Sequence, residues 1–255
     1  VKLIVDREEE IDNFVPEEYW NIYAKLSKKV DNKKKTFEAK LTGKNNKKIE
    51  MHSKEDVDKI LADIENEKYI VEDVKRTDKK RSPAPPFTTS TMQQEASRKL
   101  GFTLKKTMSV AQRLYEGIKI PERGSIGLIT YMRTDSTRIS VEARESAKKQ
   151  IEKEYGNEYY ENRFYKTKAD AQDAHEAIRP TYADLVPDKI KESLTADEYK
   201  LYKLIYNRFL ASQMASAVFD TVSASIKAGE YNFKANGQTL KFAGFMALYV
   251  ESVDN

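Results

Sequence analysis

The chain has 255 residues, of which 39% are hydrophobic and 34% are charged, and its formal net charge is +4. This length allows one large or two modest domains, and the weak positive bias permits a polyanionic partner without demanding one. The chain contains no cysteine, which excludes disulfides and thiolate metal sites and is typical of a reducing compartment. No apolar run approaches the roughly 20 residues of a membrane span, so we expect a cytoplasmic protein without a membrane partner.

The first third of the chain is predicted to hold a helix followed by strands. Apolar residues spaced among many charges predict a helix over 1–14 with a polar outer face. Its acidic run, Asp6 and Glu8 to Glu10, is interpreted as a solvated face. Aromatic and β-branched residues with partial alternation predict three strands, which cover 19–26, 36–42 and 68–75, with a lysine-rich turn over 28–35. Ser53 can cap a short helix that runs through Ile64.

A basic, proline-rich segment over 75–86 is predicted to connect two domains, because proline excludes helix and stiffens the chain. Thr89 or Ser90 then caps a helix that ends at Gly101. Thr103 begins a second helix, and the pair resembles a helix-turn-helix unit, which binds DNA about as often as it is a packed helical hairpin.

The remaining elements follow from capping residues and returning alternation. Ser140 caps a helix to Tyr155, residues 157–170 form a loop, and a Thr195–Glu198 capping box starts a helix to about Met214. Four strands with hairpin turns are predicted after it: the strands are 218–226, 231–235, 240–242 and 247–251, and the turns are 228–230 and 236–238.

This order predicts an α+β fold in which a β-rich domain is interrupted by a mainly helical domain. The β-rich domain comprises 18–82 and 217–255, and the helical domain comprises 83–216. Residues 1–17 are interpreted as the end of a preceding helical segment. Because the chain opens inside an element without an initiator methionine, we interpret it as an excised fragment.

The chemistry is concentrated in Ser125–Arg138, where an apolar run leads a tyrosine into hydroxyls, a carboxylate and two arginines. On an extended chain Tyr131 and Arg133 point the same way. A guanidinium can hold two phosphate oxygens in a fork while a phenol approaches phosphorus. A free tyrosine, with a pKa of about 10, is a poor nucleophile until positive charge stabilises its anion. The alternative is a strand that ends in a polar turn, with the tyrosine packed and the arginine solvated.

The run Gly127–Thr137, GLITYMRTDST, resembles the active-site signature of type IA DNA topoisomerases. With methionine at position 132, the motif resembles that of bacterial topoisomerase I. Topoisomerase III usually has proline at this position. Two further regions are similar to blocks of the same family. The first comprises residues 86–96, 105–107 and 111–116, and the second comprises residues 174–181.

The resemblance implies an arch-like β domain that carries a helical domain with the nucleophilic tyrosine. Tyr131 would cleave one DNA strand through a 5′-phosphotyrosine, the other strand would pass, and resealing would relax negative supercoils without ATP. Arg133 would hold the scissile phosphate. His175 and Arg179 would contact DNA phosphate or transfer a proton, although His175 could instead be a capping or core-edge histidine. Three further residues of the same run, Thr134, Asp135 and Ser136, would position the DNA.

The resemblance also implies Mg²⁺, held by an acidic Toprim domain of the same enzyme. No Asp-x-Asp motif is present in this sequence, so no metal ligand is expected here. The family's cysteine zinc modules are absent as well. We therefore expect a central fragment that is inactive alone, a monomer, with DNA (especially single-stranded DNA) and the Toprim domain as partners.

Two other functions fit parts of the sequence. A single-stranded DNA-binding module would use aromatic residues interleaved with basic ones, and such residues are Tyr159, Tyr160, Arg163, Phe164, Tyr165 and Lys166. A different tyrosine nucleophile, such as a recombinase or a replication initiator, would need several separated arginines or a metal-binding histidine pair. Only His52 and His175 are available for such a pair.

Overall fold

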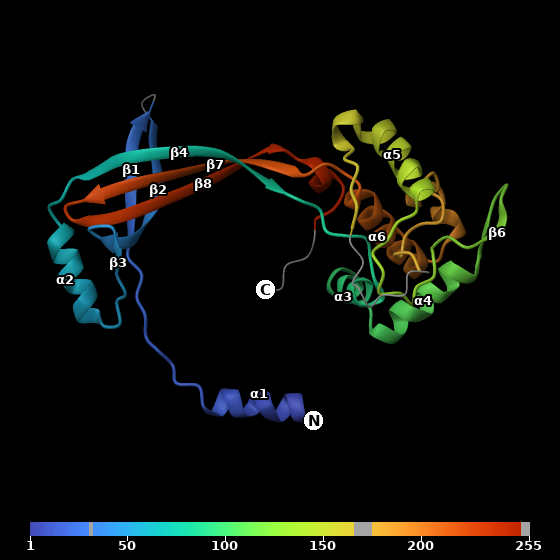
Figure 1. Ribbon diagram of the computed structural model, residues 1–255, viewed down its shortest axis with the longest axis horizontal. Coiled ribbons are helices and arrows are strands. Elements are labelled where there is room, and N and C mark those ends of the chain that lie inside the picture. Colours follow the sequence, from blue (N-terminus) through green and yellow to red (C-terminus); the bar gives the residue numbers. More distant parts are fainter. Residues whose placement is uncertain (31–32, 166–174, 251–255) are drawn as a thin grey trace. The chain divides into compact units, whose positions relative to one another are not determined.

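The computed structural model describes residues 1–30, 33–165 and 175–250. The chain forms two compact units, which Figure 1 shows as a group of long strands and a group of helices. The strand-rich unit comprises 1–78 and 220–239, and the helical unit comprises 79–219 and 240–255. The predicted α+β class is confirmed. The units divide the chain a few residues from the predicted boundaries at 82 and 217, and they place 240–255 with the helices.

The strand-rich unit is built on one antiparallel sheet in the order β1-β2-β8-β7-β4, with the short β3 paired to β2. The strands are β1 (Tyr23–Val30), β2 (Lys33–Lys44), β3 (Lys47–Lys48), β4 (Tyr69–Arg81), β7 (Ala217–Ala228) and β8 (Tyr231–Phe242). Helix α2 (Lys54–Ile64) begins at Ser53, as predicted, and buries Val57, Ile60 and Ile64 in a core with Leu41 and Phe233.

Helix α1 (Lys2–Asp12) forms where the sequence predicts it, but none of its residues is buried. Leu3 and Ile4 are exposed together with the charged residues. The expected division into an apolar inner face and a polar outer face therefore has no counterpart in packing within the described residues.

In its described residues, the helical unit contains four α-helices packed around one apolar core. These are α3 (Thr89–Leu100), α4 (Leu104–Glu116), α5 (Val141–Tyr155) and α6 (Ala196–Ser212). A small hairpin, β5 (Ile118–Ile120) and β6 (Gly124–Ile126), extends from them in Figure 1. Four short 3-10 turns complete the unit: η1 (Asn157–Tyr159), η2 (Pro187–Lys189), η3 (Lys191–Ser193) and η4 (Gly244–Ala247). The central element is α6, whose Tyr202, Ile205 and Phe209 are almost completely buried.

Several predicted boundaries in the strands were wrong. The expected turn over 28–35 is largely paired strand, with Lys28 opposite Lys35. The expected hairpin turn over 236–238 lies inside β8, which runs unbroken to Phe242. The expected connector is strand up to Arg81. The strand predicted over 247–251 does not form in its described part, because the 3-10 turn η4 ends at Ala247 and residues 248–250 are a turn and coil. Residue 251 lies outside the described residues. In the first three cases cross-strand pairing in the sheet overrides the local preference for a turn or coil.

Candidate active site

The segment after β6 is held between α4 and the chain around Pro180. The amide of Leu128 donates to the carbonyl of Leu114 at 2.7 Å, and the amide of Thr130 donates to the carbonyl of Arg179 at 2.9 Å. Ile129 and Pro180 form an isolated antiparallel bridge. The backbone that leads to Tyr131 is therefore fixed on both sides, although it is not a regular strand.

Gly127 permits the close approach to α4. A Cβ atom at this position would lie 2.6 Å from the backbone carbonyl oxygen of Tyr115, a distance at which the backbone would have to move. The glycine in the apolar run thus places the tyrosine segment directly against the C-terminal end of α4.

Side chains alternate between surface and interior beyond this point. Tyr131, Arg133 and Asp135 are exposed, whereas Met132 and Ser136 are almost completely buried. Thr134 is buried between them. The expected placement of Tyr131 and Arg133 on one face therefore agrees with the burial pattern, even though the backbone bends at Met132 and Arg133.

The first residue of α3 fixes this bend. The hydroxyl of Thr89 donates to the carbonyl oxygen of Met132 at 2.8 Å and accepts from the amide of Thr134 at 2.9 Å. The Thr89 amide donates to the carbonyl of Thr134 at 2.9 Å. Thr88, not the predicted Thr89 or Ser90, is the N-cap, so Thr89 is left to brace the loop that carries Arg133.

The candidate nucleophile lies between two rings. The Tyr131 ring is 40% exposed. Its centroid lies 5.5 Å from that of Tyr115 in an edge-on contact and 5.9 Å from that of His175. The structure thus brings together Tyr131 and His175, which the sequence proposed separately. It adds Tyr115 at the end of α4, a residue of the 111–116 region to which the sequence assigns no role of its own.

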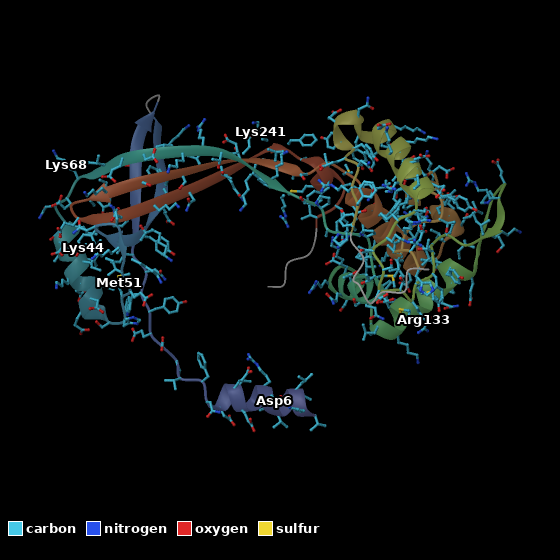
Figure 2. All side chains as sticks on the ribbon, in the orientation of Figure 1. Asp6, Lys44, Met51, Lys68, Arg133 and Lys241 are labelled. Carbon is cyan, nitrogen blue, oxygen red and sulfur yellow. The ribbon has the colours of Figure 1, made fainter. Side chains whose placement is uncertain are left out.

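Arg133 is exposed, and its side chain has no hydrogen bond or ion pair within the described part of the chain. Figure 2 labels it in the helical unit. Its guanidinium is therefore available to a ligand on the face that it shares with Tyr131.

Arg179 is placed differently. Its Nε donates to Oε2 of Glu176 at 3.1 Å, and its Nη1 donates to the carbonyl of Pro180 at 3.0 Å. The other carboxylate oxygen of Glu176 accepts from the amide of Ser140, the N-cap of α5, at 2.6 Å. Arg179 therefore joins the 176–180 segment to α5, and its side chain is only 12% exposed.

The three hydroxyl and carboxyl residues after Arg133 also separate. Thr134 Oγ1 accepts from the amide of Ser136 at 3.1 Å, and Ser136 Oγ accepts from the amide of Arg138 at 3.1 Å. These two side chains shape the loop from inside. Asp135 alone of the three is exposed.

The described residues around Tyr131 do not fit a magnesium ion. Glu176 is occupied by Arg179 and a backbone amide, and Asp135 is the one carboxylate between Tyr131 and Arg138. Within 1–30, 33–165 and 175–250, no three histidine, aspartate or glutamate side chains are grouped so that they could hold a metal. The same residues include no helix with the length and apolar character needed to cross a membrane.

The site combines the exposed Tyr131, the ring of His175 in contact with it, and the exposed Arg133, whose side chain has no hydrogen bond or ion pair within the described residues. A family model described as DNA topoisomerase matches residues 1–255, and the chain belongs to this family. Among solved structures, full-length topoisomerase I from Thermotoga maritima is similar, with 35% sequence identity and a TM-score of 0.73. The match covers 100% of this chain and 40% of that chain. The predicted resemblance to bacterial topoisomerase I is confirmed.

Proposed function

We propose that this chain supplies the nucleophilic part of a type IA DNA topoisomerase, which cleaves and rejoins one DNA strand through a 5′-phosphotyrosine at Tyr131. The observation that carries this proposal is that Tyr131 and Arg133, two residues apart, are both exposed while Met132 between them is buried. The Tyr131 ring contacts the rings of Tyr115 and His175, and the Arg133 side chain has no hydrogen bond or ion pair within the described residues. Such an arrangement suits a nucleophile whose target needs a fixed cationic holder.

In the proposed step, the Tyr131 oxygen forms a bond to phosphorus and the bond from phosphorus to the 3′ oxygen breaks. The phenol gives up its proton, and the departing 3′ oxygen gains one. Arg133 holds the non-bridging oxygens, where negative charge develops. His175, next to the Tyr131 ring, is suited to accept the phenolic proton or to hold the neighbouring phosphate. The reverse step reseals the strand, so the phosphodiester energy is conserved without ATP.

Mg²⁺ belongs, in this proposal, to a Toprim domain outside these 255 residues, because the side chains near Tyr131 do not fit it. The described residues also favour the enzyme over the single-stranded DNA-binding module. Of the aromatic residues proposed for stacking, Tyr165 donates its hydroxyl to the carbonyl of Ser212 and Tyr159 packs on the ring of Phe242. Phe164 is 72% exposed, and Lys166 lies outside the described residues.

The test compares the chain with a chimera in which residues 1–255 replace the matching part of Thermotoga maritima topoisomerase I. With magnesium and negatively supercoiled plasmid, we expect relaxation and a denaturation-resistant DNA adduct from the chimera and neither from the chain alone. Tyr131→Phe in the chimera should abolish both and leave oligonucleotide binding intact. An adduct recovered from the Phe variant would contradict the assignment of Tyr131, and relaxation by the chain alone would contradict its proposed inactivity.

A further inference from the structure

A small cavity of about 60 Å³ lies in the helical unit beside the start of α5. Three arginines line it, Arg138, Arg144 and Arg163, together with the exposed Phe164, and its lining residues within the described part of the chain include no carboxylate. Arg163 is paired with Glu161, so the positive potential of the cavity comes mainly from Arg138 and Arg144.

One wall of the cavity is fixed. Nε of Arg163 donates to the carbonyl of Met214 at 2.9 Å, and its Nη2 donates to Ser216 Oγ at 2.6 Å. Arg163 also pairs with Glu161. Its hydrogen-bonding capacity is largely used, so it contributes shape and charge to the cavity.

On the opposite wall, the hydrogen-bond donors of Arg144 are less fully used. Nε of Arg144 is buried and has no hydrogen-bond partner among the residues that the structure describes. Its Nη1 makes a long contact of 3.4 Å to Asn162 Oδ1, and its Cζ lies 4.2 Å from the centroid of the Phe164 ring. Buried donors in folded proteins are nearly always paired. An oriented guanidinium with an unpaired Nε therefore indicates a missing acceptor.

The second cation facing the cavity is Arg138, which belongs to the same loop as Tyr131. Its amide donates to Ser136 Oγ and its carbonyl accepts from the amide of Ala177 at 2.8 Å, so its backbone is fixed. Its exposed side chain has no hydrogen bond or ion pair within the described residues. Arg138 and Arg144 together offer two guanidinium groups to one small anion.

We propose that this cavity binds one backbone phosphodiester of single-stranded DNA, distinct from the phosphate that Tyr131 attacks. The inference rests on the proposed function for the identity of the ligand. The cavity has the volume of a single phosphate group, and the exposed Phe164 at its edge suits an adjoining unstacked base. Seven residues separate Tyr131 from Arg138, which an extended chain spans in at most about 25 Å. The two phosphates therefore belong to one short strand.

The test uses the chain with Tyr131→Phe, so that binding stays non-covalent. A single-stranded oligonucleotide is measured with each phosphate replaced in turn by a neutral methylphosphonate. We expect one position outside the attacked phosphate at which neutralisation weakens binding several-fold. Adding Arg138→Gln or Arg144→Gln should remove the effect at that position only, and it should lower the salt slope by about 0.7, as for one lost single-strand phosphate contact.

The matched control is Lys149→Gln, which removes one positive charge from an exposed position of α5 and should leave the methylphosphonate profile unchanged. If Arg144→Gln fails to fold, the methylphosphonate profile of Arg138→Gln tests the proposal. The Arg138 side chain is exposed, so its substitution should leave the fold intact. An arginine Nε–H NMR signal from Arg144 should shift with the oligonucleotide. It should shift less when the sensitive phosphate is neutral.

A flat methylphosphonate profile, an unchanged salt slope, or no binding at low salt would each overturn the proposal. A shift of the Arg144 signal with inorganic phosphate but not with the oligonucleotide would also overturn it, since the site would then take a free ion. A flat profile beside normal adduct formation by the chimera contradicts this inference alone. A positive profile without any adduct contradicts the proposed chemistry alone.

Discussion

The centroid of the His175 ring lies 5.9 Å from that of Tyr131, with the two planes tilted by 37°. The two residues come from separate loops that meet because Thr130 binds the segment after His175. The Thr130 hydroxyl donates to the carbonyl of Ala177 at 2.7 Å and accepts from the amide of Arg179 at 3.0 Å. The histidine is thus held beside the tyrosine by backbone contacts rather than by a bond between the two side chains.

This geometry predicts the effect of His175→Gln in the chimera. Glutamine can still hydrogen-bond to a phosphate but cannot take up a proton at neutral pH. We expect oligonucleotide binding to stay within about twofold and the rate of adduct formation to fall about 100-fold, which is typical for a general acid or base. Single-turnover cleavage and equilibrium binding measure the two quantities. A parallel loss of both would show that His175 only holds the DNA.

Tyr115 is predicted to position Tyr131. The edge-on ring pair should be worth roughly 0.5–1.5 kcal/mol beyond its buried area. Tyr115→Leu, which keeps the bulk but loses the ring, should slow adduct formation about 3- to 10-fold by the same range. Tyr115→Phe is the control and should react like the parent, because the ring pair remains. Equal losses in Leu and Phe variants would assign the role to the Tyr115 hydroxyl instead.

Thr89 is predicted to matter for the loop rather than for the fold. Thr89→Val keeps the shape of the side chain and removes the hydroxyl that contacts Met132 and Thr134. Two lost hydrogen bonds, with partners that water can reach only in part, should cost about 1–3 kcal/mol of stability. The rate of adduct formation should fall by more than the loss of folded protein explains, because the bend that Thr89 holds sets the position of Arg133. The control is Ser90→Ala, which removes a hydroxyl one residue away. Activity that survives Thr89→Val would show that the bend does not depend on this residue.

Glu198 is predicted to make the helical unit sensitive to acid. Burial raises the pKa of Glu198, but hydrogen bonds from Arg113 and from Thr195 outweigh it, so the pKa lies below its ordinary value. A carboxyl with a depressed folded-state pKa contributes stability above its unfolded pKa and loses that stability as the pH falls through the folded pKa. Glu198→Gln should therefore lower the free energy of unfolding by about 1–3 kcal/mol at pH 7. The difference from the parent should shrink below about pH 4.3, where the unfolded carboxyl becomes protonated.

Urea unfolding at pH 7, pH 5 and pH 3 measures this effect. The matched control is Glu192→Gln, an exposed carboxyl in η3, which should leave stability unchanged at all three values. A loss for Glu198→Gln that stays constant down to pH 3 would contradict the role of its charge.

The helices could be predicted because their signals are local. Ser53, Thr103, Ser140 and Thr195 each accept a bond from the amide three residues on, and apolar spacing marks the buried faces. Thr88 was missed as the N-cap of α3 because the next two residues have equally suitable side chains. What distinguishes Thr89 is a contact with residues more than 40 positions away, which no local pattern contains.

The order of exposed and buried residues near Tyr131 could be predicted from the sequence, but the contacts between distant segments could not. The sequence predicts that Tyr131 and Arg133 point the same way, and the exposure of both beside the buried Met132 agrees with this. Tyr115 and the orphaned Nε of Arg144 could not be found in this way, because both depend on how helices approach distant loops. The strand β8 was divided in the prediction at Asn236–Gly237, where a turn motif is outweighed by pairing with neighbouring strands.

The contact between Tyr249 and α3 has a consequence for how the protein is made. The Tyr249 hydroxyl donates to Oε2 of Glu95 at 2.6 Å, although the two residues are 154 positions apart, and Lys99 lies 3.8 Å from the centroid of the Tyr249 ring. During translation α3 leaves the ribosome long before Tyr249 exists. The contact between Tyr249 and α3 can therefore form only after the 153 residues between Glu95 and Tyr249 have been synthesised. Because contacts between residues far apart in the sequence form slowly, we expect the helical unit to complete its packing late in synthesis.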